Sequence, residues 1–207
     1  MTDEISRKGI LYVISAPSGA GKTTICKMIK SHEPELRQSI SFTTRPMRSG
    51  EKEGVDYHFV TGETFDRMVA EGDFAEWAEV HGNCYGTSLA TLEEARLAGA
   101  DILLDIDFQG AEQLRASDVD GVFVFILPPS MNELRKRLEG RNTDTSDVIE
   151  QRMTNAYEEI AHATRFDYLV VNDVFDKAVE EVRAIMLAES VRTSRLLENL
   201  PEEFSLK

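Results

Sequence analysis

A glycine-rich segment between an apolar run and a helical pattern carries the side chains best suited to chemistry in this chain. Residues 10–14 are apolar and predict a buried strand, and residues 25–29 predict the start of a helix. The backbone N–H groups of such a turn, together with the positive end of the helix, favour a polyphosphate ligand. The Lys22 ammonium reaches the outer phosphates of that ligand, and the Thr23 hydroxyl can bind Mg²⁺. The order of strand, loop and helix therefore predicts a phosphate-binding P-loop formed by Ala16, Pro17, Ser18, Gly19, Ala20, Gly21, Lys22, Thr23 and Thr24.

Two arginines beside three hydroxyl side chains form a second candidate site. Arg45 and Arg48 lie three residues apart and follow Ser41, Thr43 and Thr44. Two forked guanidinium groups can hold one phosphate through paired hydrogen bonds. A solvated turn with two exposed arginines explains the same spacing, so the residues alone leave both interpretations open.

Six polar side chains lie near the predicted ends of strands, where ligands bind in an open α/β sheet. Asp105 and Asp107 follow the apolar run at residues 102–104, and they share one face if the strand continues through both. They can orient Mg²⁺, directly or through water, or accept hydrogen bonds from a substrate. An aspartate that caps a helix or stabilises a turn is the alternative for each. The complete set is Tyr57, Glu76, Tyr85, Thr87, Asp105 and Asp107.

Basic residues are concentrated in one short region of an otherwise acidic chain. Arg135 and Lys136 fit surface ion pairs with Glu133 and Glu139 on a helix. We favour phosphate binding for the remaining three, because guanidinium groups match the geometry of phosphate oxygens. These three are Arg137, Arg141 and Arg152.

The elements that must position these side chains alternate between strands and helices. Three apolar runs predict strands buried on both faces, at residues 102–104, 122–127 and 168–171. Helical patterns are found at residues 130–139, at residues 146–164 and from residue 176 onward. The first of these opens with a capping box at Ser130 and Glu133. The alternation predicts an α/β layered fold with a mostly parallel sheet.

Two segments differ from this alternation and are interpreted as insertions. Residues 38–90 mix short β-type stretches with turns, which predicts a small mixed β lobe after the first helix. Residues 132–160 predict a helical insertion. Within the lobe, we expect Trp77 to pack in the core rather than against a ligand.

The composition of the 207 residues excludes several classes of protein. The net charge of −14 disfavours a general nucleic-acid-binding protein, which would present a basic face. Cys26 and Cys84 form no metal-binding or disulfide pattern and are expected to be reduced packing residues. The polar N-terminus is unlike a signal peptide, and the apolar runs are too short to span a bilayer. We therefore expect a cytoplasmic protein without membrane or nucleic-acid partners.

Taken together, these motifs resemble guanylate kinases of the nucleoside-monophosphate kinase class, of the bacterial type. Four segments carry the resemblance: residues 16–23, 43–51, 82–87 and 104–111. The chain departs from the family pattern at a few positions. Ala16 replaces the first glycine of the P-loop, and Cys84 stands where a tyrosine is usual. Asn142 and Val174 are further departures, and all of them concern local loop geometry.

The resemblance implies a three-layer P-loop kinase that transfers the γ-phosphoryl group of Mg·ATP to GMP, in purine nucleotide metabolism and GMP recycling. The implied division is a core of residues 1–37, 91–131 and 161–207, a GMP-binding lobe of residues 38–90 and a lid of residues 132–160. The implied catalytic residues are Lys22, Arg137, Arg141 and Arg152. ATP would be bound by the P-loop and Asn172, and Mg²⁺ by Thr23 and Asp107, directly or through water. The GMP phosphate would be held by Ser41, Arg45, Arg48, Tyr57 and Tyr85, and guanine would be read by Glu76, Thr87 and Asp105. Whether the protein is a monomer or a homo-oligomer stays open.

The physical chemistry of guanine agrees with these roles. Glu76 and Asp105 can accept from guanine N1–H and N2–H₂, and Thr87 can donate to O6. Adenine lacks those donors and would leave buried carboxylates unpaired, at ~1–3 kcal/mol each, so we expect discrimination against AMP. Two other functions stay open: a non-catalytic interaction module of the same fold, and a kinase acting on a phosphorylated sugar or another nucleotide. A P-loop GTPase is disfavoured, because the chain has no base-reading Asn-Lys-x-Asp motif.

Overall fold

The main sheet of the protein contains five parallel strands. The computed structural model describes residues 8–80, 82–117, 119–140, 145–197 and 200. All neighbouring strands of this sheet pair in parallel, and β1 lies at its centre between β7 and β8. In spatial order the strands are β2 (Arg37–Gln38), β7 (Ile102–Asp105), β1 (Leu11–Ser15), β8 (Gly121–Leu127) and β9 (Tyr168–Val171). The predicted strands at residues 102–104, 122–127 and 168–171 are therefore confirmed as strands. The prediction that all three are buried on both faces is wrong for β9, because β9 lies at the edge of the sheet and Leu169 and Val171 are exposed.

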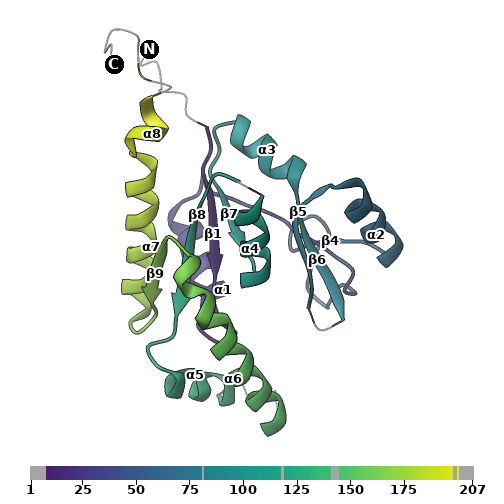
Figure 1. Ribbon diagram of the computed structural model, residues 1–207, viewed down its shortest axis with the longest axis vertical. Helices are drawn as coiled ribbons and strands as arrows, with labels where there is room; N and C mark the ends of the chain where they lie inside the picture. The colour runs from purple at the N-terminus through teal and green to yellow at the C-terminus, as the bar shows by residue number, and fades with distance from the viewer. Residues whose placement is uncertain (1–7, 81, 118, 141–144, 198–199, 201–207) are drawn as a thin grey trace.

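Helices cover both faces of this sheet and complete three layers (Figure 1). Because side chains of a strand alternate between faces, Tyr12 and Ile14 of β1 pack toward α1 and α7, whereas Leu11 and Val13 pack toward α3 and α4. The helices are α1 (Lys22–His32) and α7 (Phe175–Ser190) on one face, and α3 (Leu89–Leu97) and α4 (Phe108–Ala116) on the other. The expected α/β fold with a mostly parallel sheet is thus confirmed.

A second, four-stranded sheet lies beside the first, with helix α2 (Gly62–Glu71) next to it (Figure 1). Its spatial order is β4 (His58–Phe59), β3 (Phe42–Thr43), β6 (Asn83–Ser88) and β5 (Phe74–Val80). Strands β3 and β4 run parallel, whereas β6 is antiparallel to both β3 and β5, so the sheet is mixed as the sequence predicts. Phe65 of α2 stacks on Phe74 and is almost fully buried.

Trp77 corrects one expectation about this second sheet. Its side chain is 41% exposed, so it does not pack in a core as predicted. Position 77 lies on the outward face of β5, between the buried residues Glu76 and Ala78. The backbone of Trp77 instead joins the two sheets, because its N–H donates to the Gln113 side chain and its carbonyl accepts from the same amide. Gln113 belongs to α4, so this helix contacts both sheets.

Helices α5 (Met131–Glu139) and α6 (Ser146–Ala161) pack on each other through their own apolar cluster, which contains Leu134, Leu138, Ile149, Met153 and Ala156. The Ser130 hydroxyl caps α5 by accepting from the Glu133 N–H, as the capping box predicts. The helix predicted over residues 146–164 ends at Ala161 and continues as the 3₁₀ turn η1 (His162–Arg165). A short helix, α8 (Thr193–Leu196), follows α7. None of the described helices combines the length and apolarity that crossing a membrane requires.

Substituting Leu104→Ala tests the role of the buried face of β7. Leu104 is 1% exposed and belongs to the cluster beneath α3 and α4. We expect a loss of about 3 kcal/mol in the free energy of unfolding, measured by denaturant titration, because the smaller side chain leaves a cavity. Leu97→Ala is the matched control, since Leu97 is 69% exposed at the end of α3 and should change stability by less than about 0.5 kcal/mol. Equal losses in both variants would contradict the assignment of this face to the core.

Candidate functional site

The glycine-rich loop, residues 16–21, joins the end of β1 to the start of α1. Gly21 is the N-cap of α1 and has a φ of +101°, a left-handed conformation that favours glycine. A Cβ at this position would also lie 2.4 Å from the amide nitrogen of Asn172. Leu134 and Leu138 of α5 pack over Gly19 from the other side. The loop is therefore held between α5 and the segment that follows β9.

Asn172 is the side chain that supports this loop. It is 5% exposed, and its amide donates to the carbonyl of Ala20 at 2.7 Å. Its own backbone carbonyl accepts from Arg137 at 3.0 Å, and Glu133 lies 3.5 Å from the same guanidinium. The sequence assigns Asn172 to ATP and Arg137 to phosphate. In the structure, Asn172 contacts the loop at Ala20, and Arg137 contacts Asn172. Arg141 lies outside the described residues.

A cavity of about 550 Å³, here called the loop cavity, opens in front of the glycine-rich loop. The first residues of α1, the start of α4 and the end of β5 contribute to its walls. Helix α6 contributes Arg152, Asn155 and Glu159, which lie three and four residues apart and so share one face of the helix. Arg152 therefore lines the same cavity as Lys22, Thr23 and Thr24, and its predicted role in phosphate binding stays a prediction.

Lys22 reaches from this loop to the end of β7. Its ammonium lies 2.6 Å from Asp105 and donates to the carbonyl of Ile106 at 2.5 Å. The parallel register places Ile14 beside Asp105, so the chain turns into the glycine-rich loop next to this carboxylate. Asp105 thus neutralises the lysine that the sequence assigns to phosphates.

Asp107 is not on the same strand face as Asp105, which corrects one of the two predicted arrangements. Strand β7 ends at Asp105, and Asp107 is the N-cap of α4, where it accepts from the Gly110 N–H at 2.9 Å. The alternative of a helix-capping aspartate is therefore correct for Asp107. Thr23 and Asp107 both line the loop cavity and offer the oxygen ligands that Mg²⁺ prefers. Across the described residues, no group of three or more His, Cys, Asp or Glu side chains is placed to hold a metal ion.

A second cavity of about 260 Å³, here called the lobe cavity, lies between the two sheets. It shares Lys22, Val80 and Asp107 with the loop cavity, so the two spaces meet at these residues. The structure brings five of the predicted GMP ligands to its wall: Ser41, Tyr57, Glu76, Tyr85 and Asp105. The other three, Arg45, Arg48 and Thr87, are not among the residues that line it.

Glu76 is the buried carboxylate of the lobe cavity. It is 5% exposed, and Thr87, which lies behind it, donates a hydrogen bond of 2.5 Å to Oε1. A Cβ on Gly110 would lie 2.4 Å from Oε2, so α4 can pass this close only because residue 110 is a glycine. Burial raises the pKa of Glu76 from 4.5 to about 7, against the opposing effect of the Thr87 hydroxyl, and the negative charge of Asp107 adds to the rise.

Arg45 is buried beside the lobe cavity and is already paired. Its guanidinium lies 2.7 Å from Glu51, donates to the carbonyl of Pro46 and stands 5.4 Å from the ring centre of Tyr57. The other Glu51 oxygen accepts from the backbone N–H of Arg48, whose side chain is exposed. The two arginines are thus arranged around one carboxylate, to which the sequence analysis gives no role. Its position three residues after Arg48 is the only local signal for this pairing.

Glu159 is a second residue that the sequence analysis misses. It lies in the loop cavity, where burial and the negative charge of Asp107 raise its pKa to about 7. The sequence could have indicated this position, because Glu159 follows Arg152 by seven residues and the two side chains therefore share one face of a helix.

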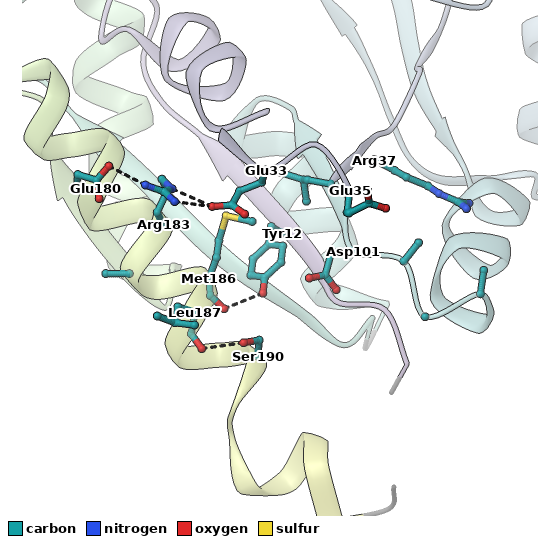
Figure 2. Close-up of a pocket in the computed structure, with 15 residues that line it drawn as sticks. Tyr12, Glu33, Glu35, Arg37, Asp101, Glu180, Arg183, Met186, Leu187 and Ser190 are labelled. Atoms are coloured by element: carbon teal, nitrogen blue, oxygen red, sulfur yellow. Dashed lines mark hydrogen bonds and ion pairs between the residues drawn. The ribbon is translucent and has the colours of Figure 1, made fainter. Parts of the chain in front are cut away.

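A larger cavity, of about 700 Å³, lies away from this site (Figure 2). Its walls include Tyr12 and Asp101 near the first residues of β1 and β7, at the sheet edge opposite the glycine-rich loop. Arg183 of α7 points to Glu33 and Glu180, and Tyr12 donates to the carbonyl of Met186 (Figure 2). It shares no lining residue with the loop cavity or the lobe cavity, so we assign it no part in the candidate site.

The substitution Glu76→Gln tests the burial of this carboxylate through the pH dependence of stability. Because the pKa is about 7 in the folded protein and near 4.5 when the chain unfolds, the wild type loses stability as the pH rises between these values. The loss is on the order of 3 kcal/mol, and the neutral glutamine should abolish it. Thermal or urea unfolding of both proteins at pH 5 and pH 8 measures the difference. Parallel pH profiles would contradict the raised pKa.

Comparison with known proteins gives one family assignment for most of the chain. The family model described as guanylate kinase matches residues 8–189. A guanylate kinase of Syntrophotalea carbinolica is 62% identical over 93% of this chain and 91% of its own length. A guanylate kinase of Geobacter metallireducens is 54% identical over 98% of this chain and 100% of its own length. The crystal structure of guanylate kinase from Anaplasma phagocytophilum superimposes with a TM-score of 0.76 at 35% identity, covering 98% of both chains.

A more distant structure shares the fold alone. The SH3-kinase fragment of tight junction protein 3 aligns over 90% of this chain and 58% of its own, with a TM-score of 0.50 at 13% identity. The family model matches nearly all residues, and the bacterial relatives are 54% and 62% identical to this chain. The chain belongs to the guanylate kinase family.

Proposed function

We propose that this protein transfers the γ-phosphoryl group of ATP to GMP, giving ADP and GDP, with Mg²⁺ as the accompanying cation. The observation that carries the proposal is that two cavities, one in front of the glycine-rich loop and one between the sheets, meet at Lys22 and Asp107. A donor in one and an acceptor in the other would bring their phosphates together there. The proposal includes the division into a core, a GMP-binding lobe at residues 38–90 and a lid at residues 132–160. It assigns the reaction to purine nucleotide metabolism and GMP recycling in the cytoplasm.

The donor side of the proposal uses the loop cavity. The backbone N–H groups of the loop and the start of α1 would hold the ATP phosphates. The Lys22 ammonium would exchange Asp105 for a phosphate oxygen, and Arg152 faces the same space from α6. Thr23 and Asp107 would hold Mg²⁺, which, when bound, neutralises charge on the donor phosphates.

The acceptor side uses the lobe cavity. Glu76 and Asp105 present carboxylate oxygens to it, which suits the N1–H and N2–H₂ donors of guanine. Thr87 acts through Glu76, because its hydroxyl proton is directed at that carboxylate rather than into the cavity. Tyr57 and Tyr85 line the wall next to Arg45, and we propose that this group binds the GMP phosphate.

Catalysis would consist of alignment and charge neutralisation. The attacking group is a phosphate oxygen of GMP, which is anionic at neutral pH, so no side chain has to remove a proton. Lys22 and the arginines would stabilise the charge that develops on the transferred group. Closure of the lid and lobe around both nucleotides would exclude water, which would otherwise compete for the phosphoryl group.

The decisive assay measures ADP formation from Mg·ATP with GMP, dGMP, AMP, UMP or dTMP as the acceptor. We expect a rate with GMP at least about a hundredfold above that with AMP, because adenine leaves Glu76 and Asp105 without donors. Lys22→Ala should abolish turnover. GMP binding without turnover would favour a non-catalytic interaction module, and turnover only with a phosphorylated sugar would favour the related kinase.

The substitution Gly110→Ala tests the placement of Glu76 without changing any polar group. The added methyl would lie 2.4 Å from the Glu76 carboxylate and must displace it. We expect the KM for GMP to rise roughly tenfold or more while the KM for Mg·ATP changes less than about twofold, since only the acceptor contact is lost.

Gly62→Ala is the matched control for this substitution. Gly62 is also helical, and a Cβ there meets no atom of the described residues within 4 Å. Its steady-state constants should equal those of the wild type. An unchanged KM for GMP in Gly110→Ala would contradict the assignment of Glu76 to the acceptor nucleotide.

A further inference from the structure

The side chain of Glu159 lies where the phosphates of the donor would bind. It belongs to the face of α6 that also presents Arg152 and Asn155 to the loop cavity. Ser18 of the glycine-rich loop lines the same cavity, and its backbone N–H is close enough to favour the charged form of this carboxylate. An anion of the protein therefore lies beside a donor group that could serve an anionic ligand.

The charges around Glu159 do not explain its position as an ordinary ion pair. Among the described residues, no Lys, Arg or His forms a salt bridge with this carboxylate. Lys22 acts on it from a distance, but Lys22 is already paired with Asp105. Asp107 adds a second negative charge nearby, and burial together with that charge raises the pKa of Glu159 to about 7. The carboxylate is held in this place at an energetic cost, which a bound triphosphate would increase.

We propose that Glu159 is an anionic placeholder that occupies the glycine-rich loop until the donor phosphates displace it, and that it thereby lowers the affinity for the donor nucleotide. The inference rests on the proposed function for the identity of that donor. It adds a residue that sets affinity on the donor side, distinct from the lysine and arginines that attract the phosphates.

Two other carboxylates near the cavities pair with cations that are assigned to nucleotide phosphates. Asp105 neutralises Lys22, and Glu51 neutralises Arg45. In each case a carboxylate of the protein pairs with a cation assigned to nucleotide phosphates. Glu159 differs because the group beside it is the backbone N–H of Ser18 and not a cation. Replacing Glu159 therefore removes a negative charge from the loop cavity without leaving a cation unpaired. Of the three carboxylates, Glu159 is therefore the one whose replacement tests the effect of charge alone.

The experiment compares binding of a non-hydrolysable ATP analogue with Mg²⁺ to the wild type and to Glu159→Gln, by calorimetric titration at pH 8. The glutamine has the same shape and no charge, so we expect roughly three- to tenfold tighter binding of the analogue. GMP, which binds in the other cavity, should bind equally to both proteins. Glu158→Gln is the matched control, because Glu158 carries the same charge on the exposed side of α6 and should leave both affinities unchanged.

Equal or weaker binding of the analogue by Glu159→Gln would overturn the inference, and weaker binding would make Glu159 a ligand of the nucleotide or its Mg²⁺. Failure of the wild type to bind the analogue would also overturn it, since there would be no donor for the carboxylate to oppose. A protein that shows the expected change but does not phosphorylate GMP would leave the inference standing and overturn the proposed function. Thermal unfolding of each variant without ligand identifies any that fails to fold, and Glu159→Ala then provides the second neutral variant.

Discussion

The ion pair between Lys22 and Asp105 is the contact around which the two cavities are arranged. Lys22 is the first residue of α1 and Asp105 the last of β7, so the pair joins the loop after the central strand to the neighbouring strand. Parallel pairing of β1 with β7 brings these ends to the same edge of the sheet. The ammonium is consequently part of the walls of both cavities. Under the proposed function, Lys22 would be near the phosphates of both the donor and the acceptor.

The loop that carries Lys22 is contacted by two distant parts of the chain, the segment after β9 and helix α5. Asn172 holds the carbonyl of Ala20 from behind, and Leu138 packs over Gly19 from α5. Arg137 links these supports, since it reaches from α5 to the carbonyl of Asn172. Helix α5 packs on α6, so both helices are connected to the loop through these contacts. If residues 132–160 form the lid that we propose, its movement would also change the support of the loop.

Much of the fold follows from local patterns, whereas the fine structure of the site depends on partners far away in the sequence. Apolar runs predict the strands, because the central strands of the sheet are buried on both faces. The glycines of the loop predict its shape, because Gly19 and Gly21 adopt positive φ. Asp107 could not be placed without knowing that β7 ends two residues earlier. The sequence predicts Trp77 as a core residue, but side chains alternate between the two faces of β5 and Trp77 lies on the outward face. Thr87 was expected to face the ligand and instead supports Glu76, eleven residues away. The roles of the site residues in binding and catalysis stay predictions, and Arg141 lies outside the described residues.

Two residues at the start of α4, Asp107 and Gly110, shape the region where the two cavities meet. Asp107 caps the helix at the junction of the cavities, and Gly110 lets the Glu76 carboxylate lie against the helix backbone. The space at this point is shared, so a larger side chain at position 110 fits only when position 76 carries a shorter one. The sizes of residues 76 and 110 are therefore coupled, and a redesign that enlarges one of them has to shorten the other. A glutamine at position 76 has the same length and leaves this constraint in place.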